Sequence, residues 1–520
     1  MTPTRALTLS CFAALIFGLC YRMIPVFGSE RTLASLFLTE DGYLLLTVSR
    51  NMAIGNGITV SDGTIWTNGF QPLITFLFTI PYLLTGGDKV AGLFGVTLIQ
   101  IAISIAAAFA IRRFAARALD PQVDSPAWSW LVTALWFIGP LLLLHSMNGL
   151  ETGLVTLVVV GTALFYGNLV ALGRRFSVAE QLLLGLLAGL CFLARNDAVF
   201  FIAAMLVVRF VQVRLTRQQS FTGAVSEAIL PGLTALAVGA PWMIYNYRLT
   251  GSIIPISGQS QSFAADFGGN LSVSPIKLME TMFPMFPVPT SLEGSVPLLL
   301  LCALLAGGTL AWFLLRATRR GGPFLPVIWA YTLYAVGIFS YYSLEFGAPW
   351  FLSRYFAPLA PLLLVAAVSV MYDVFAVFGR HRDLARCAVG IAALLLCAVL
   401  LSRLLLPGVR EQGHFQVVDW VEENVPDEVW VGAIQTGTLG YWHDRTINLD
   451  GKVNPAALEA LLTEGDVLDY TLRTEIEYLV DWVGIAKWPD IEGRAFNKVF
   501  ETLVEDPERN LGVLGKRAAN

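Results

Sequence analysis

Two adjacent carboxylates, Glu40 and Asp41, stand at the start of the most chemically varied stretch of the sequence, residues 39–72. The stretch follows the first apolar segment, continues as an amphipathic pattern and ends in a loop rich in Gly, Asn and aromatic residues. An ionised Asp within hydrogen-bond reach of a hydroxyl group takes its proton as the oxygen attacks an electrophile. We therefore predict that this stretch forms the floor of an active site, with Asp41 as general base and Glu40 as a second catalytic acid.

The acidic pair also has an ordinary explanation. Negative charge near the first turn of a helix suits the helix dipole, and most exposed carboxylates are simply solvated. The pair by itself favours this explanation, so the case for chemistry depends on the polar residues that the fold places nearby.

The composition indicates a polytopic α-helical membrane protein. Of 520 residues 56% are hydrophobic and 14% are charged, and apolar runs of nearly membrane-spanning length recur along most of the chain. The net charge of −4 and the scattered cations give no indication of nucleic acid binding. The six cysteines fall in or beside apolar segments without a CxxC pattern, which predicts small core residues and neither a disulfide framework nor a metal site.

About eleven transmembrane helices are expected. The first, residues 6–27, lacks a following small-residue cleavage pattern and should be retained. Segment 70–85 contains Pro72 and Pro81 and is short, so we expect it to dip into the membrane without crossing. The other spans are predicted at 90–111, 128–146, 150–172, 178–194, 197–213, 224–246, 295–316, 324–342, 350–375 and 387–406.

Arginine clusters fall at every second connection, which predicts the topology. The clusters are at 112–117, 174–175, 214–217 (with Arg214 and Arg217), 316–320 and 380–386. The positive-inside rule assigns them to the cytoplasm. With a cytoplasmic N-terminus, parity then places residues 28–70, 247–294 and everything after 406 on the outer side. We expect a multi-pass protein of the cell's inner (plasma) membrane.

The C-terminal part changes character, and we predict two domains: a transmembrane catalytic module over 1–407, with first outer loop 28–70, and a soluble extracytoplasmic domain over 408–520. A helix at 414–424 and strands at 428–434 and 446–449 predict an α/β or α+β fold. The polar residues of LGYWHDRTINLDGKVNP, among them Asp444 and Lys452, lie between turn-forming Gly residues and are expected to be structural.

Further polar residues share the outer side with Asp41 in this topology: Glu151, Arg195, Arg248, Arg354 and Tyr355. Each alone is explained by helix capping, an aromatic belt or snorkelling of a long side chain. Together they predict a cationic cup beside a carboxylate, which suits a phosphate leaving group.

Short motifs recur in order over nearly the whole chain: TEDGYLLLTVSRNMAIGNG, TNGFQPL, MNGLET, ARND, RLTGSIIP, SRYFAPLAP and LGYWHDRTINLDGKVNP. On these motifs the sequence resembles the GT-C superfamily of membrane glycosyltransferases, which use polyprenyl-phosphate sugars and include protein O-mannosyltransferases, aminoarabinose transferases and arabinofuranosyltransferases. The resemblance implies that Asp41, the second acid of the first outer loop, is the catalytic base. Glu40 stands where the family often has Asp, and Gln71-Pro72 lacks the basic residue that often precedes the proline.

The resemblance further implies a lipid-phosphate sugar donor and a glycan, lipid or protein acceptor. We expect transfer by inversion, and no metal or other cofactor, because one or two Arg side chains suffice for the charge of the leaving phosphate. Because the family's basic residue before Pro72 is missing, we assign the donor phosphate to Arg354 and Arg195. We expect substrate contacts from Tyr43, Asn68, Gln71, Glu151, Arg248 and Tyr355.

Two other classes stay open. A transporter or flippase requires charges within the spans and broken helices in symmetric halves, whereas this chain keeps its charges mostly at span ends. A non-catalytic glycan-binding envelope protein would keep the outer domain and tolerate the loss of Asp41.

Overall fold

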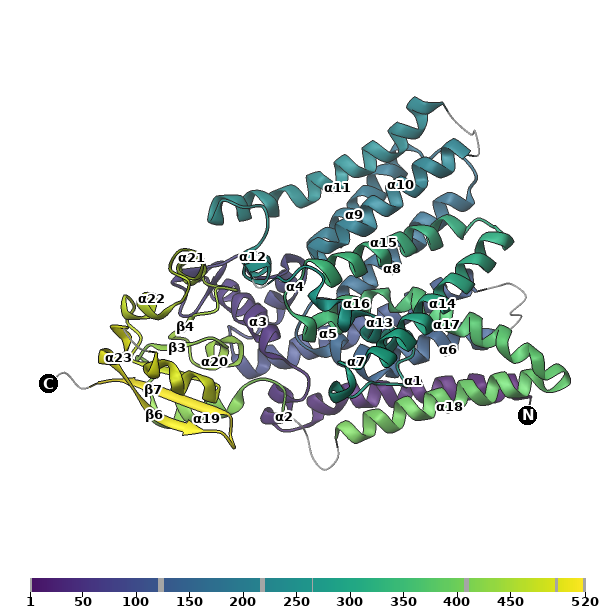
Figure 1. Cartoon of the computed structure of the whole chain (residues 1–520). Helices are drawn as coiled ribbons and strands as arrows, with labels where there is room; N and C mark the ends of the chain where they lie inside the picture. The colour runs from purple at the N-terminus through teal and green to yellow at the C-terminus, as the bar shows by residue number, and fades with distance from the viewer. Residues whose placement is uncertain are drawn as a thin grey trace.

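The computed structural model shows a bundle of long helices with a small α/β domain at one end (Figure 1). It describes residues 2–119, 126–215, 220–263, 265–405, 411–491 and 494–517. Two predictions fall outside these residues, namely the domain boundary after residue 407 and the position of Arg217.

Within the described residues, nine helical segments are long and apolar enough to cross a membrane. They are α1 (Pro3–Phe27), α5 (Lys89–Ala118), α8 (Thr152–Ala171), α10 (Val199–Leu215, with the short turn before it), α11 (Phe221–Thr250), α14 (Val296–Arg320), α15 (Leu325–Leu344), the run Pro349–Gly379 containing α16 (Leu352–Phe356) and α17 (Ala360–Val374), and α18 (Arg382–Leu404).

The two other predicted spans are present in different forms. Segment 128–146 is a pair of helices, α6 (Pro126–Ile138) and α7 (Pro140–Met147), bent by 62° where Gly139 and Pro140 interrupt the ladder. The second is the 17-residue α9 (Val178–Ala194). The predicted polytopic helical fold is therefore confirmed. The segment expected to re-enter the membrane forms α4 (Pro72–Leu84), whose 13 residues are too few to span a bilayer.

Small residues allow the helices to approach closely, as is typical of membrane bundles. Gly185 and Gly189 lie on one face of α9 against α11, and a Cβ atom at either would stand 2.5 Å from the Cβ of Thr234 or Val238. Gly18 of α1 meets Ile138 of α6 in the same way, at 2.8 Å. These glycines are needed for the close approach of the helices rather than for a special backbone angle.

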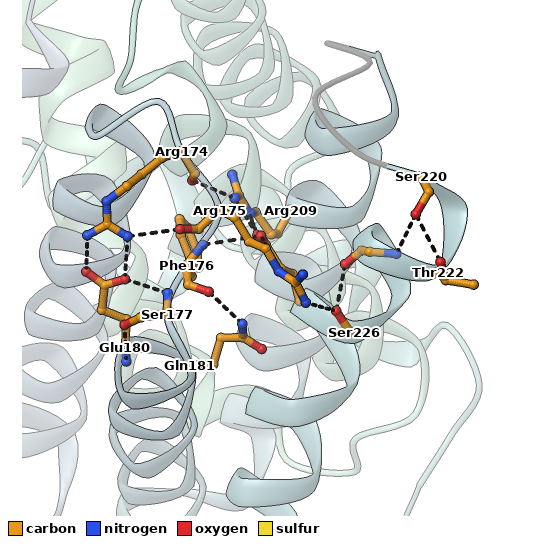
Figure 2. Close-up of polar contacts among 12 residues, drawn as sticks. Arg174, Arg175, Phe176, Ser177, Glu180, Gln181, Arg209, Ser220, Thr222 and Ser226 are labelled. Atoms are coloured by element: carbon orange, nitrogen blue, oxygen red, sulfur yellow. Dashed lines mark hydrogen bonds and ion pairs between the residues drawn. The ribbon is translucent and has the colours of Figure 1, made fainter.

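Arginine clusters gather at the bundle end remote from the C-terminal domain. Figure 2 shows the α8–α9 connection there, where Arg175 donates to Ser226 at 2.9 Å. The buried carboxylate of Glu227 on α11 pairs with Arg209 of α10 and accepts from the backbone N–H of Phe176 before α9, so these three helices are held together at this end. Arg320 of α14 donates to the carbonyl of Ala118 at 3.1 Å, which brings the end of α5 to the same region.

The segment between α1 and α4 forms α2 (Glu30–Ser35), α3 (Glu40–Ala53) and a hairpin of β1 (Thr59–Val60) and β2 (Ile65–Trp66). Gly42 lies against the turn between α7 and α8, where a Cβ atom would stand 2.3 Å from the carbonyl oxygen of Asn148. This close approach fixes the start of α3, and with it Asp41, against the bundle. Two short helices, α12 (Ile256–Phe263) and α13 (Ser274–Met282), follow α11.

The C-terminal domain has a five-stranded mixed sheet of order β4-β3-β5-β7-β6. β3 is parallel to β4 and β5, and β7 is antiparallel to β5 and β6. Its elements are α19 (Phe415–Asn424), β3 (Val431–Ala433), α20 (Gly437–Trp442), β4 (Thr446–Asn448), α21 (Pro455–Glu464), α22 (Leu468–Leu472), β5 (Tyr478–Asp481), α23 (Phe496–Val499), β6 (Phe500–Asp506) and β7 (Leu511–Lys516). The predicted first helix and two strands agree with α19, β3 and β4.

Both faces of this sheet are covered, because neighbouring residues of a strand point to opposite sides. Leu479 and Leu514 join one apolar cluster, while Val480 and Val513 join the other beneath α19. The domain therefore has cores of its own.

The domain packs on α2, α3, α4 and the start of α5. The carboxylate of Glu40 accepts hydrogen bonds from the backbone N–H groups of Gly437 and Thr438 at the start of α20. The hydroxyls of Tyr82 and Tyr441 lie 2.9 Å apart, and Lys89 donates to the carbonyl of Trp442 at 2.8 Å. The segment between α1 and α4 is thus enclosed between the bundle and the C-terminal domain.

Candidate active site

A cavity of about 480 Å³ lies where the bundle meets the C-terminal domain. Its polar lining comes from α3, the turn before α8, the α9–α10 junction, α16 and the loop after β4. Its apolar lining comes from α3, α9, α10, α11, α15 and the segment before α12, among others. The polar residues are Asp41, Gln71, Glu151, Arg195, Asn196, Asp197, Arg354, Tyr355 and Lys452, among others.

Asp41 lies between two cations. Arg354 Nη1 donates to its Oδ2 at 2.9 Å, and Lys452 Nζ lies 3.9 Å from its Oδ1. Burial by itself would raise the pKa of Asp41, but Lys452 and Arg354 outweigh burial and hold this pKa below its ordinary value. Asp41 is therefore ionised at neutral pH and acts as an acceptor only.

Arg354 is held in place by its own helix. Its Nη2 donates to the hydroxyl of the neighbouring Tyr355 at 2.8 Å, and its guanidinium lies over the Tyr355 ring. The Nε–H is buried and has no hydrogen-bond partner among the described residues. An unmatched buried guanidinium N–H is costly, and an anionic ligand would supply the missing acceptor.

A second polar group surrounds Arg195, at the junction of α9 and α10. Its Nε donates to Asp197 at 2.8 Å, and its Nη1 lies 3.9 Å from Glu151. Tyr342 of α15 donates to the other oxygen of Asp197 at 2.8 Å and stacks on Tyr355. Arg195 is thus flanked by two carboxylates, whereas one carboxylate, Asp41, is shared by Arg354 and Lys452.

Three cations and three carboxylates line the cavity. The cations are Arg195, Arg354 and Lys452, and the carboxylates are Asp41, Glu151 and Asp197. An anion that enters must therefore compete with a carboxylate for its contacts. Arg354 and Lys452 share Asp41, and Lys452 pairs with Asp450 as well.

Six of the residues predicted from the sequence line this cavity: Asp41, Gln71, Glu151, Arg195, Arg354 and Tyr355. They come from four widely separated parts of the chain, and the fold brings them to one space. Their roles in binding and catalysis remain proposals.

The structure does not bring the four other predicted residues into the described lining. Glu40, expected to be catalytic, points to the C-terminal domain and caps α20. Tyr43 is fully buried, donates to the carbonyl of Ala34 and packs against Tyr441. Glu40 and Tyr43 lie one and two positions from Asp41, and residues at these spacings face other sides of the same helix, which explains the difference.

Asn68 and Arg248 also lie elsewhere. The buried Asn68 side chain accepts from the backbone N–H of Ile256 and so fixes the chain after α11. Arg248 is exposed in the last turn of α11, where a cation suits the helix dipole.

Lys452 is a lining residue that the sequence had indicated as structural. It also pairs with Asp450 at 3.1 Å. Its loop reaches the cavity because Gly69 has no side chain: a Cβ atom there would stand 1.9 Å from the Lys452 carbonyl oxygen. A single Lys beside an Asp-Gly turn carries no local signal of this placement.

Cations face both carboxylate oxygens of Asp41. Among the described residues, no group of three or more His, Cys, Asp or Glu side chains is arranged to hold a metal ion.

Comparisons with known proteins agree on the fold. Residues 407–507 match the family described as "Domain of unknown function (DUF8728)". No curated protein matches the sequence.

Several solved structures are similar to this chain over nearly its whole length. ArnT from Cupriavidus metallidurans bound to undecaprenyl phosphate has 15% identity and a TM-score of 0.55, over 100% of this chain and 99% of that one. The archaeal oligosaccharyltransferase AglB from Archaeoglobus fulgidus, in complex with an inhibitory peptide and a dolichol-phosphate, has 12% identity and a TM-score of 0.60. The similarity covers 98% of this chain and 74% of that one.

A third similar structure is the Archaeoglobus fulgidus oligosaccharyltransferase in complex with Zn and sulfate, with 14% identity and a TM-score of 0.59. The similarity covers 94% of this chain and 71% of that one. The resemblance to the GT-C superfamily inferred from the motifs is therefore confirmed for the fold.

Proposed function

We propose that this protein, which has the fold of the GT-C glycosyltransferases, transfers a sugar from a polyprenyl-phosphate carrier to a hydroxyl group of an acceptor. The observation that carries the proposal is the meeting of Asp41, Arg354 and Lys452 at one cavity. A carboxylate beside two cations suits a reaction in which a hydroxyl loses a proton while a phosphate leaves.

The cavity has chemistry for both parts of such a donor. Arg354 and Lys452 offer charge to a phosphate, and Arg354 Nε still has an open donor position. Phe192, Val199 and Met243 supply an apolar wall on the side of α9, α10 and α11. Two proteins of the same fold are described with dolichol-phosphate and undecaprenyl phosphate, which supports a donor of this class.

The reaction is a displacement at the anomeric carbon. The acceptor oxygen forms the new bond to this carbon while its proton passes to Asp41. The bond from the anomeric carbon to the phosphate oxygen breaks, and its electron pair stays on the phosphate, where Arg354 and Lys452 stabilise the charge. Attack from the side opposite the phosphate inverts the anomeric centre.

Donor binding also makes Asp41 a better base. In the ligand-free protein Arg354 and Lys452 keep the pKa of Asp41 low, which weakens its basicity. A phosphate that takes over these contacts adds negative charge beside Asp41, and a nearby like charge raises a carboxyl pKa. The base is therefore strengthened only when the donor is in place.

The site is assigned to the outer face of the inner (plasma) membrane. The arginine clusters at the remote end of the bundle favour a cytoplasmic location for that end. This leaves the N-terminus in the cytoplasm and the C-terminal domain outside. Acceptors of this compartment are glycans, lipids and proteins of the envelope.

A donor panel tests the proposal. Purified protein in lipid nanodiscs is incubated with polyprenyl-phosphate sugars labelled in the sugar and with an envelope extract as acceptor. Transfer of label together with release of polyprenyl phosphate supports it. Binding of the lipid donors without transfer from any of them would instead favour a non-catalytic glycan-binding protein.

A further inference from the structure

A second cavity, of about 280 Å³, lies at the bundle end remote from the C-terminal domain, between α14, α17 and the start of α18. It is separate from the site around Asp41, with which it shares no lining residue. Its lining contains four arginines and one carboxylate: Arg316, Arg320, Arg382, Arg386 and Asp373. Trp312, Phe313 and Tyr372 add aromatic surface.

Arg386 is fixed as a rigid part of the wall. Its side chain is only 4% exposed, and its Nε donates to the carbonyl of Tyr372 at 2.7 Å. The guanidinium lies 3.5 Å from the centre of the Tyr372 ring. A buried arginine held by backbone and aromatic contacts loses little further freedom when it binds an anion.

Two carboxylates hold other arginine side chains at the cavity in place. Asp373 binds Arg316 at 2.8 Å and accepts from the indole N–H of Trp312 at 3.1 Å. Asp383 lies 3.1 Å from Arg386 and 3.9 Å from Arg382. The Arg382 side chain remains 58% exposed at the mouth, within reach of an entering ligand.

The cavity lies at the ends of helices of membrane-spanning length, which indicates the level of the bilayer surface. α14 ends at Arg320 and α18 begins at Arg382, and both helices are long and apolar enough to span a membrane. Basic pockets between transmembrane helices at this level suit the phosphate of a lipid headgroup, and a tryptophan suits the interface beside it.

We propose that this cavity is a binding site for a phosphate-ester anion, the headgroup phosphate of a membrane lipid in the leaflet opposite the catalytic site. Arg382 and Arg316 contact the phosphate oxygens, and Arg386 provides the fixed positive wall. The alternative, in which these arginines only orient the protein in the membrane, requires no specific binding.

The test compares three variants of the full-length protein in detergent, with lipid binding followed by native mass spectrometry and by thermal unfolding. Arg316→Gln with Arg382→Gln removes two charges from the cavity. Arg319→Gln, on the same exposed turn of α14 but outside the lining, is the matched control. Arg354→Gln reports on phosphate lipids that bind at the catalytic cavity instead.

The probes are phosphatidylglycerol, phosphatidylcholine and glycerol phosphate. The proposal predicts that phosphatidylglycerol binds the double variant about 30-fold more weakly than wild type, from the typical effect of two basic residues near a membrane surface. Arg319→Gln and Arg354→Gln should retain wild-type affinity. Arg382→Gln alone changes a largely exposed side chain and should lose part of the affinity for phosphatidylglycerol. This single variant replaces the double variant in the test if the double variant does not fold.

Stabilisation by phosphatidylglycerol but not by glycerol phosphate assigns the site to a lipid. Equal stabilisation by both, with the same arginine dependence, assigns it to a soluble phosphate ester. Equal affinity of all variants for phosphatidylglycerol, or loss only in Arg354→Gln, would overturn the proposal.

Discussion

Arg354 donates to the carboxylate of Asp41 over 2.9 Å, although 313 positions separate the two residues in the sequence. The contact joins the expected base to the expected phosphate-binding group in the ligand-free protein. An anion that binds Arg354 must loosen this ion pair, so donor binding and the basicity of Asp41 are coupled through one guanidinium.

Arg354→Gln should shift the pH dependence of transfer. In the wild-type protein Arg354 helps to hold the pKa of Asp41 low, so removal of this cation should raise that pKa. The acid limb of the kcat/KM profile, which reports the free enzyme, should therefore move to higher pH. The measurement is kcat/KM for a labelled donor between pH 4 and 9. An unchanged acid limb would show that Arg354 does not tune the base.

Arg354→Lys separates charge from geometry. If the phosphate is held by two N–H groups, an ammonium cannot replace the guanidinium fork, and donor turnover should fall by about tenfold or more. Wild-type turnover by the Lys variant would show that only the positive charge at this position matters, and that the paired N–H groups of the guanidinium do not.

Lys452→Gln should weaken donor use although the residue belongs to the C-terminal domain. Loss of one charged hydrogen bond to the phosphate typically costs about 1.5–3 kcal/mol, which corresponds to roughly 10- to 150-fold in kcat/KM. Lys487→Gln, at an exposed position of the same domain, is the control and should behave as wild type. Full activity of Lys452→Gln would mean that the C-terminal domain supplies no charge to the site.

Glu40→Gln should affect docking of the C-terminal domain more than the chemistry. The carboxylate caps the start of α20 and accepts from Thr438 Oγ1 at 2.6 Å. Loss of its charge should cost about 1 kcal/mol, as for a helix cap, and speed proteolysis within the domain. Glu30→Gln, which changes an exposed acid in the same segment between α1 and α4, is the comparison. A loss of transfer with normal protease resistance would instead restore the catalytic role first expected for Glu40.

The positions of Asp41 and Arg354 were predictable because each lies beside an apolar span, and the alternation of arginine clusters places both on one side. The same logic found Glu151 and Arg195. Hydrophobic runs also predicted the helices, since the length of a span follows from bilayer thickness.

Other features depend on contacts between distant segments and have no local pattern. Lys452 reaches the cavity only because the chain at Gly69 permits close approach. The role of Glu40 requires α20 to lie beside α3, and neither segment predicts the other. The bend at Gly139 is different, because the Gly139-Pro140 pair is a local signal for it, but apolar residues continue through the pair and the segment looks like one span.

The central claim is that Asp41 is the general base, and Asp41→Asn tests it most directly. Asn keeps the volume and an acceptor oxygen for Arg354 but cannot take a proton at neutral pH. Purified Asp41→Asn should bind the polyprenyl-phosphate donor and unfold at a temperature near that of wild type. Single-turnover transfer to the acceptor should fall by about 10²- to 10⁴-fold. Asp62→Asn, in the β1–β2 hairpin that follows α3, should transfer at the wild-type rate. A folded Asp41→Asn protein that transfers the sugar as fast as wild type would contradict the account.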